Sequence, residues 1–408
     1  MKKVLLSLIL VFSIFTIVGC TNDGEDQVAQ GVTEDKVLVG NTAATSGFVA
    51  FVGEPFKAGM DAYFNMVNED GGVAGREIEY VHYDDGFDQA QGQTYTQKLI
   101  EDDQVFALVG HFGTPTVSTT MEYLDTVGIP RVYYATGISA LFNDDAQGGE
   151  RSSFPVQPIY DAEGEVMVAR AVAELDAERI GVIYSNADDG KGILRGIQNR
   201  INDLDVTLAA ISQVASDADD MSIAAQSMIS ADVDVVIIAA NQGPAATAVR
   251  ALQDAGSTIP VVTSYVNADA TWLTGVSDVV DSGSFNIYAN AWIDINENQD
   301  DVDLFVQEIS KINADYAGNA YAFAGWIAAA AFVEGLERVG EDELTWENYI
   351  DAMEEDLVEL PFGVVVDYSE NRRVGTQAMA FLKAASVDDV AVWETEKPIQ
   401  TIKDIIGE

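Results

Sequence analysis

The segment 105-VFALVGHFGTPTVSTT-120 sets the fold of the chain around it. Val105 to Val109 is a short apolar run, which is typical of a strand buried on both faces. After a glycine-bounded break, Thr114 stands where a helix N-cap is expected, and Pro115 suits the first helical position because its missing N–H costs nothing there. This arrangement directs free backbone N–H groups and the positive end of a helix dipole into one crevice. A small anion would fit there; the alternative is an ordinary turn with nothing bound.

Length and composition indicate a globular protein with more than one domain. The chain has 408 residues, which suits two or three domains, and 48% of them are apolar, enough for a sizeable core. Its 67 acidic residues outnumber 21 Lys and Arg, giving a net charge of −46. Such a surface repels nucleic acid and anionic lipid headgroups, so we exclude nucleic-acid binding. Because the acids are spread along the whole chain, adaptation to a salty environment is one hypothesis for them.

The N-terminal region has the features of an export signal. Residues 1–19 combine two early lysines with an apolar stretch that is short for a membrane span, which predicts a signal peptide. The ending 17-IVGC-20 resembles a bacterial lipobox, in which Cys20 would be lipidated; the alternative is a plain secretory signal. Residues 20–35 are polar and are expected to form a lipid-anchored tether. Since Cys20 is the only cysteine, disulfides and cysteine metal sites are excluded.

Strands and helices alternate in two successive series. In the first series, Pro55 is expected to open one helix, a second helix is expected to end near Glu101, and a third is expected from Thr114 to Val127. Gly71 to Gly75 precedes a strand instead of following one, which predicts a turn and not a phosphate-binding loop. The strands predicted for this series are Val37–Asn41, Glu77–Tyr83, Val105–Val109 and Ile129–Tyr134.

The second series begins after Pro158 and has a similar length. It should contain a helix at Asp161–Leu175 and another that begins near Gly192. The predicted strands are Arg179–Tyr184, Val206–Ile211, Val233–Ala240 and Ile259–Thr263. Two such series predict an α/β protein with two parallel-sheet lobes of like architecture. The later chain, which includes a long apolar helix at Ala320–Val339, must be shared between them.

Catalytic and metal-binding patterns are weak. The chain has two histidines and lacks the G-x-S-x-G elbow, so no enzyme chemistry is expected. Acidic and amide residues alternate from Asp294 to Asp300 as in a calcium loop, but Gln299 replaces the required glycine and Phe305 the required acid. We therefore expect a solvated loop, with no metal and no cofactor.

The order of motifs resembles the branched-chain amino-acid binding proteins, which have the type I periplasmic binding fold. The likeness runs from about Val37 to Tyr368, and no single motif in it is specific. The residues that carry it are Ser46-Gly47, Val67-Asn68, Gly71-Gly72-Val73-Ala74-Gly75-Arg76, Tyr83-Asp84-Asp85, Val109-Gly110-His111, Gly128-Ile129-Pro130, Ala135-Thr136 and Ala255-Gly256. The resemblance implies two Rossmann-like lobes with parallel sheets, joined by three hinge crossovers near Pro155, Tyr288 and Pro361. The N-lobe would comprise residues 36–155 and 289–361, and the C-lobe residues 156–288 and 362–408.

The resemblance also implies a ligand site between the lobes. Gly113 and Thr114, together with Tyr134, Ala135 and Thr136, match the family's contacts to the ligand carboxylate. Val52 and Tyr321 match positions that line the side-chain pocket.

The C-lobe positions depart from the family pattern. Asp189 stands where amino-acid binders carry an aromatic residue, Asn241 where they carry a tyrosine, and Tyr265 where an acid holds the ligand ammonium. Either Asp188 or Asp189 supplies that charge, or the ligand is a small amide, a urea-like compound or a carboxylate.

The expected function is therefore that of an extracytoplasmic solute-binding lipoprotein of an ABC importer. It would be a monomer held on the outer face of the cytoplasmic membrane through Cys20. Its lobes would close on a small amino-acid-like ligand and then dock on a membrane permease. The alternatives are a secreted enzyme and a ligand-sensing module for a signalling partner; the chain ends at Glu408 without an attached signalling segment.

Overall fold

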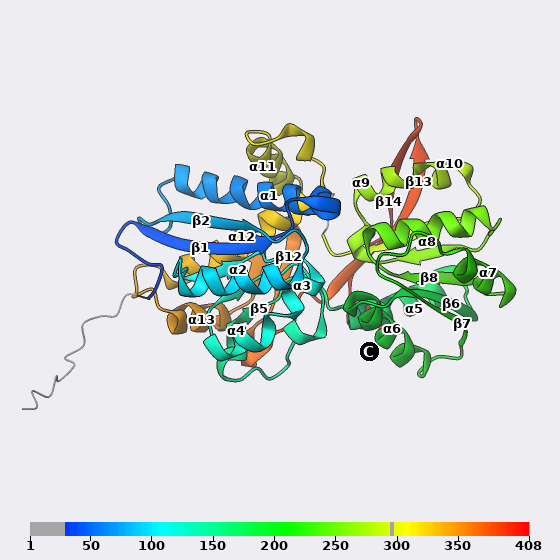
Figure 1. Ribbon diagram of the computed structural model, residues 1–408, viewed down its shortest axis with the longest axis horizontal. Helices are drawn as coiled ribbons and strands as arrows, with labels where there is room; N and C mark the ends of the chain where they lie inside the picture. Colours follow the sequence, from blue (N-terminus) through cyan, green and yellow to red (C-terminus); the bar gives the residue numbers. More distant parts are fainter. Residues whose placement is uncertain (1–28, 294–297, 408) are drawn as a thin grey trace, which may run out of the picture.

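The computed structural model describes residues 29–293 and 298–407. Two lobes lie side by side, each built on its own β-sheet (Figure 1). The signal peptide predicted at residues 1–19 and the lipidated Cys20 lie outside the described residues. Among those described, no helix is long and apolar enough to cross a membrane.

The N-lobe is built on a five-stranded parallel sheet with the order β2-β1-β3-β4-β5. Its strands are β1 Lys36–Ala43, β2 Glu77–Asp84, β3 Ala107–Val109, β4 Arg131–Val132 and β5 Ser153–Phe154. Its helices are α1 Ala50–Glu69, α2 Gln89–Glu101, α3 Thr114–Ser118, α4 Met121–Val127, α11 Gln299–Ile309, α12 Ala320–Val339 and α13 Trp346–Glu355. Strand β3 lies at the centre of the sheet with all its residues buried, as its apolar sequence predicts. Helix α12 has the predicted bounds and packs along α1 in the core.

The C-lobe is built on a seven-stranded sheet with the order β14-β13-β10-β9-β8-β6-β7. Strands β6 to β10 are parallel, whereas β13 and β14 are antiparallel to their neighbours. The strands are β6 Arg179–Ser185, β7 Thr207–Val214, β8 Val235–Ala239, β9 Val261–Thr263, β10 Ile287–Ala291, β13 Ala378–Val387 and β14 Val390–Thr401. The helices are α5 Tyr160–Leu175, α6 Asp188–Ile201, α7 Ser222–Ser230, α8 Gln242–Asp254, α9 Ala270–Gly275, α10 Ser277–Ser282 and α14 Ile402–Ile406.

Several local predictions need correction. Helix α1 starts at Ala50 and carries Pro55 inside it, so Pro55 does not open the helix. The N-cap of α3 is Gly113 and not Thr114, and the single helix predicted as far as Val127 is two helices, α3 and α4. Helix α6 begins at Asp188, four residues before Gly192, so its first turn carries two acids beside the helix dipole.

The predicted boundary between residues 288 and 289 falls inside β10. Residues Ala289 to Ala291 pair with β13 and therefore belong to the C-lobe sheet. We accordingly propose that the second crossover follows Ala291.

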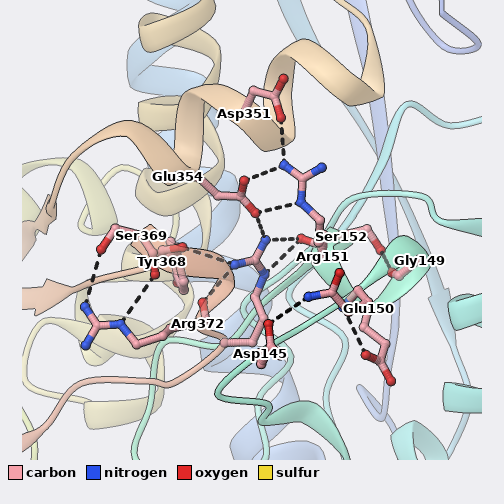
Figure 2. A network of polar contacts seen from close by, with 12 residues as sticks. Asp145, Gly149, Glu150, Arg151, Ser152, Asp351, Glu354, Tyr368, Ser369 and Arg372 are labelled. Atoms are coloured by element: carbon pink, nitrogen blue, oxygen red, sulfur yellow. Dashed lines mark hydrogen bonds and ion pairs between the residues drawn. The ribbon is translucent and has the colours of Figure 1, made fainter.

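The segment from Phe362 to Arg373, predicted for the C-lobe, packs on the N-lobe. It contains β12 Val364–Val366, which forms a small hairpin with β11 Val358–Leu360. The rings of Tyr368 and Phe154 meet edge to face with centroids 5.1 Å apart. Figure 2 shows a polar network beside this segment, in which Glu354 of α13 pairs with Arg151. The fully buried Arg373 also pairs with Glu354. We therefore propose that the third crossover follows Arg373.

The prediction of a tether over residues 20–35 does not hold for residues 29–35, the part of it that the structure describes. Residues 29–35 lie against the N-lobe, where the side-chain amide of Gln30 donates to the carbonyl of Val105 at 2.8 Å. Val32 is largely buried and bridges to Val37. The described part of this segment is therefore attached to the folded body.

Candidate functional site

One large cavity of about 1420 Å³ lies between the two lobes. Turns at the carboxyl ends of the parallel strands line it from both sides, which is where ligands bind in open α/β sheets. The volume exceeds the roughly 300–1,000 Å³ of a typical small-molecule pocket. The predicted site residues on its wall are Val52, Gly113, Thr114, Ala135, Asp189, Asn241, Tyr265 and Tyr321.

Two predicted site residues, Tyr134 and Thr136, are not on the cavity wall. Tyr134 is buried and stacks on His111, with ring centroids 4.6 Å apart. Tyr133 lines the wall instead of Tyr134. Tyr133 directly follows the end of β4 and has a left-handed backbone conformation, with φ 42°. Thr136 is buried behind the wall, where its hydroxyl lies 2.8 Å from the hydroxyl of Thr114.

The C-lobe side of the cavity presents hydrogen-bond acceptors. Asp189 is 8% exposed, and its carboxylate accepts from the hydroxyl of Ser185 at 2.9 Å. Burial raises the pKa of Asp189 above its ordinary value, and the hydrogen bond from the backbone N–H of Gly190 offsets only part of this rise. The amide nitrogen of Asn241 donates to the hydroxyl of Tyr160 at 3.2 Å, whereas its buried Oδ1 has no hydrogen-bond partner. Both groups are therefore available to a ligand that donates hydrogen bonds.

Tyr160, which sequence reasoning missed, joins the two sides of the cavity. It is the first residue of α5, and its hydroxyl interacts with Thr114 and Thr136 from the N-lobe as well as with Asn241. Burial raises its pKa to about 12, so the hydroxyl stays protonated. The sequence places it after Pro158 at a crossover, but only the meeting of the two lobes brings it to the site.

A row of aromatic rings forms the deep apolar part of the cavity. Phe56 lies with its ring centroid 6.4 Å from that of Phe112 and 6.0 Å from that of Tyr133, which in turn lies 6.0 Å from Trp292. All four line the cavity and are nearly inaccessible to solvent. The sequence could have indicated two of these residues. Phe112 lies in the turn after a predicted strand, and Trp292 follows a strand close to a predicted crossover.

Every charged side chain on the described cavity wall is acidic. These residues are Asp88, Asp189, Asp217, Asp219 and Asp269. No lysine, arginine or histidine of the described chain lines the cavity. The local field therefore favours a cationic or zwitterionic group over a simple anion.

Metal ligands do not gather in the described chain. No group of three or more His, Cys, Asp or Glu residues there could hold a metal ion. Part of the acidic loop considered above, residues 294–297, lies outside the described residues.

Comparison with known proteins places the chain in a family. The sequence profile of periplasmic binding proteins matches residues 36–389, which is most of the chain. The chain belongs to the periplasmic binding protein family. The resemblance to branched-chain amino-acid binding proteins and the type I fold are thereby confirmed, and the relatives reported below are named as binding proteins, not as enzymes.

Named relatives of this binding protein are distant. An amino acid binding protein of Pseudomonas aeruginosa is 25% identical over 170 residues, which cover 42% of this chain and 44% of that protein. A leucine-specific-binding protein of Salmonella typhimurium is 23% identical over 172 residues, covering 42% and 45%. The chain thus spans a little under half the length of these curated relatives.

Solved structures share the fold over nearly the whole chain. A fatty acid ABC transporter substrate-binding protein from Thermomonospora curvata superposes with a TM-score of 0.76 at 19% identity, covering 93% of this chain and 96% of that one. A solute-binding protein from R. palustris in complex with 4-hydroxybenzoate gives 0.77 at 18% identity, covering 90% and 97%. At these identities the likeness establishes the fold alone.

Proposed function

We propose that this chain is an extracytoplasmic solute-binding lipoprotein of an ABC importer. It captures an amino acid with a large apolar side group between two closing lobes. The observation that carries the proposal is the interlobe cavity, whose wall combines the Thr114 hydroxyl of the N-lobe, acceptor groups of the C-lobe and a row of aromatic rings. The proposal is also supported by the names of two relatives, an amino acid binding protein and a leucine-specific-binding protein.

The distribution of polar groups fits a zwitterion. On the N-lobe side, Thr114 offers a hydroxyl at the start of α3, a suitable place for a carboxylate. Across the cavity, Asp189 and the free Oδ1 of Asn241 accept hydrogen bonds from an ammonium group. Asp189 forms no ion pair with any described residue, so a ligand cation would be its natural partner.

The aromatic row would hold the ligand's side group. Phe56, Phe112, Tyr133 and Trp292 offer a surface without charge, and burying an apolar group there contributes about 25 cal/mol per Å². A small amide or urea-like compound remains the second candidate, because Asn241 and Tyr265 can hydrogen-bond it. A simple carboxylate fits less well among acidic wall residues.

Export, anchoring and delivery complete the proposal. A signal peptide at residues 1–19 and lipidation at Cys20 would hold the protein on the outer face of the membrane, where it delivers ligand to a permease as a monomer. Retention of a Cys20→Ala variant in the membrane fraction would contradict the anchor. A sensor role is the other candidate; permease and ATPase genes next to this one would favour import.

A thermal-shift screen tests the ligand class. Leucine, phenylalanine, glycine, acetamide, urea and 4-hydroxybenzoate are added separately to the wild type, Asp189→Asn and the exposed control Asp254→Asn. We expect leucine or phenylalanine to raise the midpoint of the wild type and the control, and Asp189→Asn to abolish the shift by removing the charge that pairs with the ammonium.

Other outcomes would change the proposal. Stabilisation by acetamide or urea alone would select the second candidate. Stabilisation by 4-hydroxybenzoate that survives Asp189→Asn would remove the ammonium from the ligand. In a bound state, Thr114→Val should cost about 1–3 kcal/mol of binding free energy if the ligand carboxylate loses its hydroxyl partner.

A further inference from the structure

Asp269 is a buried carboxylate that touches both lobes. It precedes α9 in the C-lobe and is only 1% exposed. Its Oδ1 accepts from the backbone N–H groups of Thr271 at 2.7 Å and Trp272 at 3.1 Å, in the first turn of α9. Its Oδ2 accepts from the backbone N–H of Ala320 at 3.1 Å. Ala320 is the first residue of α12, which packs in the N-lobe (Figure 1).

Two further hydrogen bonds cross between the lobes at the same place. The side-chain amide of Asn319, which caps α12, donates to the hydroxyl of Thr271 at 3.4 Å. The hydroxyl of Tyr321 donates to the carbonyl of Val266 at 3.2 Å. The indole N–H of Trp393 donates to the backbone carbonyl of Asp269 at 3.4 Å. This bond holds the backbone at Asp269 to the rest of the C-lobe. Asp269 therefore lies within a defined interlobe contact beside the cavity.

The charge of Asp269 is balanced by helix ends. No lysine, arginine or histidine of the described chain forms an ion pair with it; its partners are N–H groups at the start of α9 and of α12. Such N–H groups have no acceptor within their own helix. If the lobes separate, the bond to Ala320 is lost while those within the C-lobe remain. The Ala320 contact therefore forms only when the lobes are together.

We propose that Asp269 is the positioning residue that locks the two lobes together around the cavity. One oxygen caps a helix of its own lobe, and the other captures the N-terminus of a helix in the opposite lobe. The lock holds the closed arrangement and so slows release of whatever the cavity contains. This inference rests on the proposed solute-binding function, but the contact itself is independent of the ligand class.

Two variants from opposite lobes separate this role from simple helix capping. Asp269→Asn keeps an oxygen that can cap α9, because asparagine is a good N-cap, but its NH₂ group cannot accept from Ala320. Ala320→Pro removes the donor instead; proline is favoured at the first helical position, and the preceding Asn319 already has the extended backbone that proline requires. Asp234→Asn is the matched control, because Asp234 accepts only from Glu178 and Arg179 of its own lobe.

Small-angle X-ray scattering of the full mature chain measures lobe closure. Each variant is examined without ligand and with a mixture of the twenty amino acids. We expect both lock variants to lower the ratio of closed to open molecules about tenfold, equivalent to about 1.4 kcal/mol, and so to increase the radius of gyration. Asp234→Asn should match the wild type. The double variant Asp269→Asn/Ala320→Pro should be no more open than either single variant, because both remove the same bond.

Each outcome decides the proposal. Equal radii of gyration for the wild type and both lock variants under both conditions would overturn it, as would fully additive effects in the double variant. A cooperative thermal unfolding transition shows that each variant is folded. Because the two substitutions lie in different lobes, local damage to one lobe cannot explain the same effect in both variants. The amino-acid mixture could leave every radius of gyration unchanged while the two lock variants are more open than the wild type without ligand. That result would contradict the proposed ligand class and support the role of Asp269.

Discussion

Glu163 lies on α5 with its side chain fully buried behind the cavity wall. Its carboxylate accepts from the backbone N–H of Tyr265 at 2.6 Å and from the hydroxyl of Ser264 at 2.9 Å. Burial raises the pKa of Glu163 to about 8, despite these hydrogen bonds. Below that pH the carboxyl group is neutral and helps to hold Tyr265, a predicted site residue, at the cavity.

The raised pKa of Glu163 predicts a loss of stability as the pH rises. Between about 4.5, the ordinary value, and about 8, the folded state binds a proton that the unfolded state has released. The contribution is therefore fully present below pH 4.5 and is lost as the pH rises through 8, with a slope of at most about 1.4 kcal/mol per pH unit. Glu163→Gln should remove this slope in thermal unfolding between pH 5 and 8.5, whereas the exposed control Glu343→Gln should keep it. Parallel curves for all three proteins would contradict the assignment.

At the scale of elements, α1 and α12 approach closely because each presents a glycine to the other. A Cβ on Gly325 would lie 1.8 Å from the carbonyl oxygen of Phe56, and one on Gly59 would lie 2.0 Å from that of Ala322. This close contact places Phe56 of α1 and Tyr321 of α12 on the same cavity wall. Backbone packing between two helices thus shapes the proposed site.

Gly325→Ala is therefore expected to push α1 away. Overpacking of this kind costs about 1–3 kcal/mol of unfolding free energy, measured by chemical denaturation. Binding of any ligand found in the screen should also weaken, because Phe56 moves. Gly275→Ala, where a Cβ would meet nothing within 4 Å, is the control. Equal stability of the two variants would show that the helices separate at no cost.

For the whole molecule, the dominant physical property is its charge. A net charge of −46 makes the compact state repel itself at low ionic strength. At molar salt the screening length falls to about 3 Å, so this repulsion largely disappears. We expect the midpoint of thermal unfolding to rise between low and molar KCl. Sucrose at equal osmolality does not screen charge, so it should raise the midpoint less. Identical midpoints in low and molar salt would refute the hypothesis of adaptation to a salty environment.

The sequence alone predicted the two-lobed architecture, and eight of its ten proposed site residues line the cavity. Alternating apolar strands and helices predicted two parallel-sheet lobes, and glycine turns after strands predicted where ligand groups would gather, including Gly113 and Thr114. These features depend on local periodicity and turn chemistry, which neighbouring residues carry.

Only the tertiary structure decided the rest. Tyr133, not Tyr134, lines the cavity, and Asp269 contacts Ala320 across the cleft. The ion pair between Arg373 and Glu354 supports the proposed assignment of the last crossover segment to the N-lobe. Each depends on residues that are far apart in the chain. Periodicity within a short window contains no information about such contacts, because they arise only when two separately folded lobes come together.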